Sequence, residues 1–323
     1  MATDPKKYKL NYSMLRIKDP KVSIKYYEFL GLRLIETKEL PGSNSDLYFL
    51  AYDSPKAPHH RHAPSDREGV VGLKHTRGSE SDPNFKIATG NAEPGKGFGH
   101  LCISVDNIQA ACKRIEDAGY KFQKKLSDGR MRHIAFSLDP DGYWVEIIGQ
   151  NPVDATEEVT MTDTEQYGLN HTMIRVKDAE KSIAFYRDVM GMSLLRTAEM
   201  KEARFNLYFL GYENQPAWKN TTSGGGGGSP LARREGLLEL TWNYGTEKQA
   251  DFHYHSGNTE PLGFGQICVT VDDLDAACER FEKLGVKWQK RLTDGTMKNL
   301  AFILDCDGYW IEIMQNTTLK VKR

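Results

Sequence analysis

Two histidines and two glutamates interrupt otherwise apolar stretches of this 323-residue chain. They are His100 in "GFGHLCISV", Glu146 in "YWVEII", His171 in "LNHTMIRV" and Glu239 in "GLLELTW". A carboxylate inside an apolar strand either faces solvent or is buried with a partner, because an unpaired buried charge is very unfavourable. Imidazole and carboxylate ligands together suit Zn²⁺, Ni²⁺, Mn²⁺ or Fe²⁺. The four residues are therefore a candidate His₂Glu₂ metal set, although each of them alone also fits a structural role.

The other segments that could do chemistry carry less weight. "HHRH" (59–62) lies in a polar loop that we expect to be solvated, and "HYH" (253–255) precedes a turn, which favours a surface or hydrogen-bonding role. "GKGFG" (95–99) lacks the flanking strand and helix that a phosphate-binding loop requires, and there is no serine or cysteine nucleophile motif. Metal-dependent chemistry is what these residue types favour.

The sequence segments that must position the four residues occur twice in the chain, as an internal repeat. "YSMLRIKDPKVSIKYYEFLGLRLI" (12–35) returns as "HTMIRVKDAEKSIAFYRDVMGMSLL" (171–195), and residues 128–148 return after a larger offset. The extra residues of the second copy include "SGGGGGS" (223–229), which we interpret as a flexible surface insertion. We expect two homologous domains at 8–150 and 167–317, joined by a polar linker at 151–166.

Each copy reads as two sets of one strand, one helix and three further strands. Alternating apolar residues predict the strands, and helical spacing of apolar residues predicts the helices. The helix of the second set has Ile108, Ala111, Cys112 and Ile115 on one face, and we expect Asp106 to cap it. The pattern predicts an α+β fold of four such modules, paired into two domains.

Composition excludes several classes of partner. The chain has 43 Lys+Arg against 44 Asp+Glu, with a formal net charge of −1, so nothing points to nucleic acid or an anionic membrane. Its first residues lack the apolar core of a signal peptide, and no apolar run approaches a membrane span. Five cysteines without a CxxC motif predict free thiols in a reducing compartment. We expect a soluble cytoplasmic protein.

Several segments resemble glyoxalase I (lactoylglutathione lyase), in the two-domain form of the vicinal oxygen chelate superfamily that occurs in fungi. They are "MLRIKDP", "LYFLAY", "LELTWNYGTE", "SGNTEPLGFG" and "DPDGYWVEI". The resemblance covers nearly the whole chain and implies paired βαβββ modules. It also implies a metal ion between domains, each of which supplies a different pair of ligands.

Carried onto this sequence, the family pattern gives two composite sites. The first joins His171 and Glu239 to His100 and Glu146, and all four ligands are present. The second site would join Tyr12, Gly72, Gln266 and Glu312. Among these residues, only Glu312 matches the ligand that the family has at its position. An amide binds a divalent ion weakly and glycine offers no side-chain ligand. We therefore expect one intact site and one degenerate site in each chain, and an active monomer.

The resemblance also implies the reaction and the residues that carry it. The family substrate is the hemithioacetal of glutathione and methylglyoxal, which is isomerised to S-lactoylglutathione with a divalent ion as Lewis acid. Zn²⁺ is preferred by analogy with eukaryotic relatives, with Ni²⁺ or another divalent ion as alternatives. Glu146 would be the main base and Glu239 would act on the opposite face of the substrate.

Substrate-binding positions follow in the same way. Arg175 and Asn243 match residues for the glutamyl end of glutathione. Three basic positions for its carboxylates match Lys96, Lys124 and Arg130, although the family usually has arginine where Lys96 stands. The apolar pocket for the methyl group and the sulfur substituent would be lined by Met131, Ile134, Phe136, Met200, Leu207 and Phe209.

Three other functions are alternatives to this one. A diverged isomerase or lyase of the same fold would act on another glutathione adduct or on a secondary metabolite. A non-catalytic small-molecule binder predicts ligand losses in both composite sites, which the intact first set contradicts. An extradiol-type dioxygenase would need a triad of two histidines and one carboxylate, and Glu239 as a fourth ligand argues against it.

Overall fold

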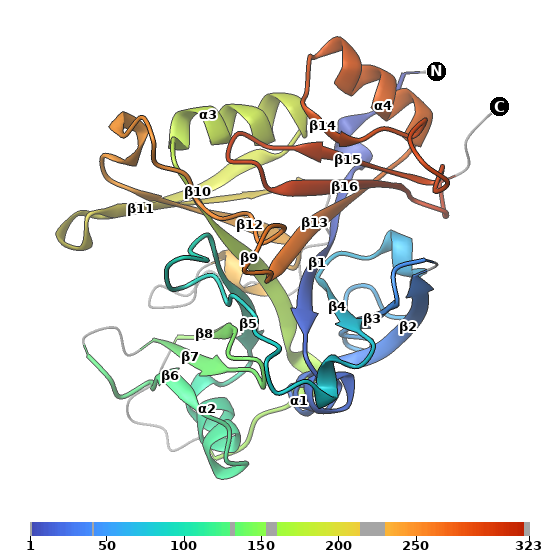
Figure 1. Ribbon diagram of the computed structural model, residues 1–323. Helices are drawn as coiled ribbons and strands as arrows, with labels where there is room; N and C mark the ends of the chain where they lie inside the picture. The colour runs from blue at the N-terminus through green and yellow to red at the C-terminus, as the bar shows by residue number, and fades with distance from the viewer. Residues whose placement is uncertain (1, 41, 130–132, 153–159, 214–229, 320–323) are drawn as a thin grey trace.

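The computed structural model describes residues 2–40, 42–129, 133–152, 160–213 and 230–319 (Figure 1). These residues form four modules of one strand, one helix and three strands, which confirms the α+β fold class. The first repeat contains β1 (Lys9–Ile17), α1 (Pro20–Phe29), β2 (Arg33–Leu40), β3 (Ser45–Ala51), β4 (Val70–Thr76), β5 (Phe98–Val105), α2 (Ile108–Asp117), β6 (Phe122–Lys124), β7 (Ile134–Leu138) and β8 (Trp144–Gly149).

The second repeat has the same order of elements. It contains β9 (Gly168–Val176), α3 (Ala179–Ala184) continued by a π-helical turn (Phe185–Val189), β10 (Ser193–Met200), β11 (Phe205–Gly211), β12 (Leu237–Asn243), β13 (Phe264–Val271), α4 (Leu274–Lys283), β14 (Trp288–Lys290), β15 (Leu300–Leu304) and β16 (Trp310–Gln315). The predicted glycine-rich insertion at 223–229 lies outside the described residues.

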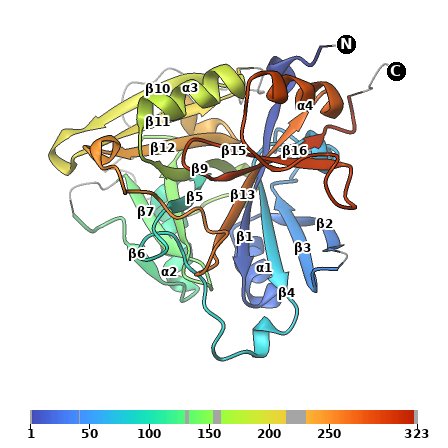
Figure 2. The same ribbon diagram turned by 45° about the horizontal axis from the view of Figure 1, so that its top comes forward.

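The strands form two eight-stranded sheets, and each sheet combines both repeats (Figures 1 and 2). One has the order β10-β11-β12-β9-β5-β8-β7-β6, with β5 and β9 antiparallel at its centre; we call it the β5–β9 sheet. The other has the order β14-β15-β16-β13-β1-β4-β3-β2, with β1 and β13 antiparallel; we call it the β1–β13 sheet. The first half of each repeat therefore pairs with the second half of the other.

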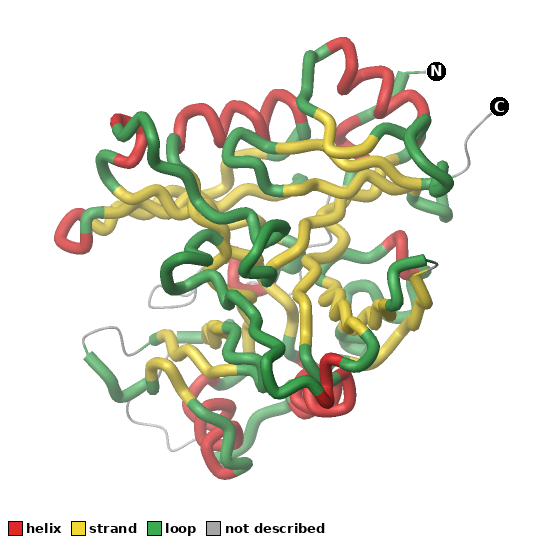
Figure 3. The backbone as a smooth tube through the Cα atoms, in the orientation of Figure 1, coloured by secondary structure: helices red, strands yellow, loops and turns green. Residues whose placement is uncertain are grey.

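The helices, in contrast, pack within their own repeat. The guanidinium of Arg114 in α2 lies 3.8 Å from the centre of the Phe29 ring in α1. In the second repeat, Arg280 of α4 donates a hydrogen bond to the backbone oxygen of Val189. Figures 1 and 3 show α3 and α4 at one end of the molecule and α1 and α2 at the other, with most of the strands between them and short helical turns elsewhere. Helix packing within repeats and strand pairing between repeats interlock the two halves of the chain.

The predicted cap of α2 is wrong by one residue. Asn107 is the N-cap, and its side chain accepts a hydrogen bond from the Ala110 N–H at 2.8 Å. Asp106 instead accepts hydrogen bonds from the hydroxyl of Thr162 and from the N–H of Asp163, at the entry to β9. Pairing of β9 with β5 brings these donors to Asp106, which spacing along the chain cannot reveal. Within the described ranges, no helix has the length and apolar character that crossing a membrane needs.

Candidate metal centre

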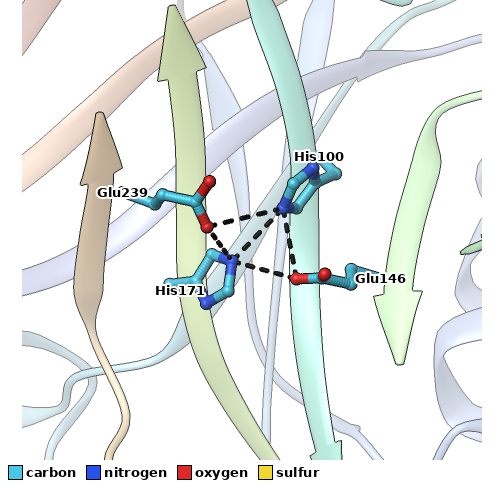
Figure 4. A group of neighbouring side chains, drawn as sticks. All are labelled: His100, Glu146, His171 and Glu239. Atoms are coloured by element: carbon cyan, nitrogen blue, oxygen red, sulfur yellow. Dashed lines mark hydrogen bonds and ion pairs between the residues drawn. The ribbon is translucent and has the colours of Figure 1, made fainter. Parts of the chain in front are cut away.

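Four neighbouring strands of the β5–β9 sheet each contribute one residue of the predicted metal set (Figure 4). His171 and His100 come from the central strands β9 and β5, while Glu239 and Glu146 come from the flanking strands β12 and β8. Side chains alternate between the faces of a strand, and the register places these four on the same face. The structure thus brings together residues from both repeats.

The distances fit ligands around a single ion. One ligand atom from each residue lies within 4.8 Å of the other three. His171 Nε2 is 2.9 Å from Glu239 Oε2, 3.2 Å from Glu146 Oε2 and 3.2 Å from His100 Nε2. Ligand atoms held about 2.1 Å from one metal ion lie about 3.0–3.4 Å apart in tetrahedral geometry or at adjacent octahedral positions, and about 4.2 Å apart across an octahedron. The distance of 4.0 Å between His100 Nε2 and Glu239 Oε2 fits a pair of the last kind. The side chains are buried, with no residue of the set more than 7% exposed.

The charges of the set also call for a cation. Burial by itself raises the pKa of Glu146, but the imidazoles of His100 and His171 outweigh it and hold the pKa below its ordinary value. Burial by itself lowers the pKa of His171, but its contacts with Cys102, Glu146 and Glu239 raise the pKa well above the ordinary value. Two buried carboxylates need compensating charge. A divalent ion with two neutral imidazoles and two carboxylates supplies it.

We expect the affinity of the metal-free chain for a divalent ion to rise with pH across the neutral range. The neighbouring carboxylates raise the pKa of His171 and favour its protonated form, whereas a ligating imidazole must be neutral, so the ion competes with a proton. Displacement of one proton makes the affinity change about tenfold per pH unit. Calorimetric titration in two buffers of different ionisation enthalpy measures the protons released. A pH-independent affinity without proton release would contradict this expectation.

The predicted apolar pocket residues flank the ligands. The ring of Phe136 lies edge-on to His100 with centroids 5.3 Å apart, and Phe209 is placed in the same way 5.5 Å from His171. Strand register puts three further half-buried pocket residues on the same face, namely Ile134, Met200 and Leu207. Met131 and Arg130 lie outside the described residues.

Several of the predicted glutathione-binding residues already have protein partners. Arg175 donates to the backbone oxygens of Phe98 and Gly90 at 2.9 and 3.1 Å, and to the side-chain oxygen of Asn91 at 2.8 Å. Its counterpart Arg16 makes the same type of contacts in the β1–β13 sheet. Arg175 therefore has a structural role within the protein, which its position in the sequence did not reveal. Its role toward substrate stays a prediction.

The other three described positions also make hydrogen bonds within the protein. Asn243 donates to the hydroxyl of Tyr254 at 2.8 Å, and the Lys124 ammonium donates to the backbone oxygen of Ile134 at 2.9 Å. Lys96 is half-buried just before β5, and its backbone oxygen accepts a hydrogen bond from the His255 N–H. Their contacts with substrate likewise stay predictions.

The corresponding positions of the β1–β13 sheet are filled by side chains of the protein. The carboxylate of Glu312 accepts hydrogen bonds from the hydroxyl of Tyr12 and, at 2.7 Å, from the amide of Gln266. A Cβ atom on Gly72 would lie 3.1 Å from the Tyr12 ring, so the ring occupies the space that a side chain there would need. Phe49 packs edge-on against the same ring, with centroids 5.1 Å apart.

Lys38 is a feature of this second position that the sequence analysis missed. Its ammonium lies 5.1 Å from the centre of the Phe49 ring and 3.3 Å from the Glu36 carboxylate. Alignment of β2 with β10 places Ala198 at the equivalent position of the intact set. A comparison of the two copies residue by residue would have found this difference.

We expect Tyr12→Phe to lower stability and to leave turnover unchanged. The substitution removes the hydroxyl donor of buried Glu312 and leaves the Gln266 amide as a donor. Loss of a hydrogen bond to a buried polar group lowers the free energy of unfolding by about 1–3 kcal/mol. Denaturant unfolding and steady-state kinetics of the same preparation test both parts. A decrease in kcat comparable with that of a ligand substitution would contradict the second part.

Comparison with known proteins agrees with the fold. The model of the Glyoxalase/Bleomycin resistance protein/Dioxygenase superfamily matches residues 9–147 and 168–313. A lactoylglutathione lyase of Schizosaccharomyces pombe is 43% identical over 316 residues, covering 97% of this chain and 98% of the relative. Glyoxalase I of Saccharomyces cerevisiae is 42% identical over 312 residues, covering 94% of this chain and 91% of the relative.

A solved structure supports the same assignment. The crystal structure of glyoxalase I from Zea mays superposes with a TM-score of 0.67 at 25% identity, covering 96% of this chain and 93% of that one. The sequence relatives and the solved structure both extend over nearly the whole chain, so they include both repeats. The resemblance noted from the sequence is confirmed, and the chain belongs to the glyoxalase I (lactoylglutathione lyase) family of this superfamily.

Proposed function

We propose that this chain isomerises the hemithioacetal of glutathione and methylglyoxal to S-lactoylglutathione at one metal centre, formed by His100, Glu146, His171 and Glu239. The observation that carries the proposal is the contrast between the two sheets. In one sheet, four ligand atoms gather within 4.8 Å of one another. In the other, Tyr12 and Gln266 are hydrogen-bonded to Glu312, which is the counterpart of Glu146.

The reaction moves a weakly acidic proton between adjacent carbon atoms of the substrate. A divalent ion held by the four ligands supplies Lewis acidity, which stabilises the negative charge that develops on the substrate oxygens. The two carboxylates enter from opposite sides of the histidine pair, because β8 and β12 flank β5 and β9. In our proposal, Glu146 removes the proton and Glu239 acts on the opposite face of the substrate.

The surrounding side chains orient the substrate and exclude water. Phe136 and Phe209 form apolar walls beside the two imidazoles, where the methyl group and the sulfur substituent are expected to lie. In a site with little water, each charge acts more strongly on the reacting atoms. The ends of glutathione carry carboxylates, and the proposal assigns them to Arg175, Asn243, Lys96, Lys124 and Arg130.

The proposal includes the ion, the oligomeric state and the compartment. Two imidazoles and two carboxylates suit Zn²⁺, and Ni²⁺ is the main alternative. One chain contains the complete set, so we propose an active monomer. All five cysteines are free, which supports a reducing compartment such as the cytoplasm.

A direct test combines an absorbance assay on methylglyoxal plus glutathione with metal analysis of the same sample. We expect formation of the thioester product and one divalent ion per chain. A sample that contains the ion without turning over this substrate would refute the proposed substrate and favour a diverged isomerase or a binder. A sample that turns over the substrate after complete removal of metal would refute the metal centre.

A further inference from the structure

Asn170 lies between His171 and the segment that leads into β12. Its side-chain nitrogen donates to the backbone oxygens of Leu231 and Arg234, each at 2.7 Å. Its side-chain oxygen lies 2.8 Å from Nδ1 of His171, and the residue is 2% exposed. Leu231 belongs to the short helical turn Pro230–Arg233, a few residues before β12 and its ligand Glu239.

These contacts leave one arrangement of hydrogen atoms. Backbone oxygens only accept hydrogen bonds, so the amide nitrogen of Asn170 must face Leu231 and Arg234, and the amide oxygen must face the imidazole. An amide oxygen also only accepts, so Nδ1 of His171 must carry the hydrogen. In the neutral ring that a metal ligand requires, the lone pair is then on Nε2, which is the atom 2.9 Å from the Glu239 carboxylate.

We propose that Asn170 is a positioning residue that fixes the tautomer and the ring orientation of His171 for metal binding. Through its two amide hydrogen bonds, it also ties His171 to the segment before the strand of Glu239. Partners of the second ring nitrogen typically raise metal affinity 10–100-fold. The inference rests on the metal centre of the proposed function and adds to it a residue outside the ligand set.

The other repeat provides a matched control. Asn11 donates to the backbone oxygens of Pro64 and Arg67, each at 2.8 Å, and is 3% exposed. The next residue is Tyr12, whose phenol ring has no nitrogen to orient. The two amide–carbonyl contacts are therefore common to both repeats, whereas the contact with an imidazole belongs to the intact set.

The experiment compares Asn170→Leu with Asn11→Leu. Both variants lose two amide–carbonyl hydrogen bonds, so we expect similar losses of stability in chemical denaturation. Only Asn170→Leu is expected to weaken Zn²⁺ binding, by about 10–100-fold in competition with a chromogenic chelator. It should also change the visible absorption spectrum of the Co²⁺-substituted protein. Asn170→Asp keeps an acceptor for Nδ1 and should restore the affinity without restoring the stability.

Three results would overturn the positioning role: equal affinity losses in the two leucine variants, unchanged affinity in Asn170→Leu, or an aspartate variant as weak as the leucine variant. Nitrogen NMR of the unchanged Zn²⁺ protein gives a test that does not depend on folding of a variant. It should show the hydrogen of His171 on Nδ1, and a hydrogen on Nε2 would overturn the proposal. Lack of turnover by a Zn²⁺-loaded chain would refute the proposed activity alone, because these affinities and spectra would still decide the role of Asn170.

Discussion

Replacing Glu146 with glutamine is expected to lower kcat by about 10²–10⁴-fold, the usual contribution of a general base. Glutamine keeps the shape of the side chain but cannot take up a proton at neutral pH. The carboxylate lies beside both histidine ligands, with Oε2 3.3 Å from His100 Nε2 and 3.2 Å from His171 Nε2, which places it at the proposed reaction centre. Steady-state kinetics with the hemithioacetal, together with chelator competition for the bound ion, separate loss of the base from loss of the metal.

Glu312→Gln is the matched control for this substitution. Glu312 occupies the equivalent place in β16, it is 4% exposed against 7% for Glu146, and it is bonded to Tyr12 and Gln266. We expect its replacement to leave kcat almost unchanged. Comparable losses in the two variants would show that the second composite site is also catalytic, contrary to the proposed function.

Removal of the divalent ion is expected to reduce turnover to the background rate, and one equivalent per chain is expected to restore it. The donor set of two imidazoles and two carboxylates occurs once among the described residues. Without the ion, the set lacks the Lewis acid that stabilises the charge developing on the substrate oxygens. Treatment with a chelator, followed by titration with Zn²⁺ and measurement of initial rates, gives the stoichiometry.

Two variants check the assignment of the ion to one sheet. His100→Ala should lose the tightly bound ion, because it removes one of the four ligands. Gln266→Ala, at the equivalent strand position of the β1–β13 sheet, should keep one ion per chain. Two tightly bound equivalents after dialysis of the unchanged chain, reduced to one in Gln266→Ala, would contradict the expected stoichiometry.

The sequence was informative where burial makes a residue type unusual. An ionisable side chain in an apolar strand needs a partner, so Glu146 and Glu239 were candidates before any contact was known. Apolar alternation and helical spacing were enough to predict the four modules. Residue types alone made the four residues a candidate set, and their assignment to one composite site between the repeats came from the resemblance to glyoxalase I.

Contacts between distant segments explain what the sequence did not predict. Asp106 accepts hydrogen bonds from residues that follow the linker, so Asn107 is the cap of α2. Arg175 is bonded to the segment before β5 because that segment lies beside β9 in the folded sheet. The sequence did not single out Asn170, because both repeats have asparagine at this position. The two copies differ in the next residue, which is His171 in one and Tyr12 in the other.

The stretch of sequence that is repeated differs from the group of strands that forms a composite site, because each sheet contains strands of both repeats. Each repeat is a continuous stretch of chain, but each sheet, and with it each composite site of the proposed function, combines one half of each copy. Tyr12 and Gly72 lie in one repeat and Gln266 in the other, yet all three meet in the β1–β13 sheet. Under the proposed function, loss of ligands in one repeat alone would have affected both composite sites. Substitutions confined to one sheet can occur in both repeats and still leave the four residues of the proposed metal centre in the other sheet unchanged.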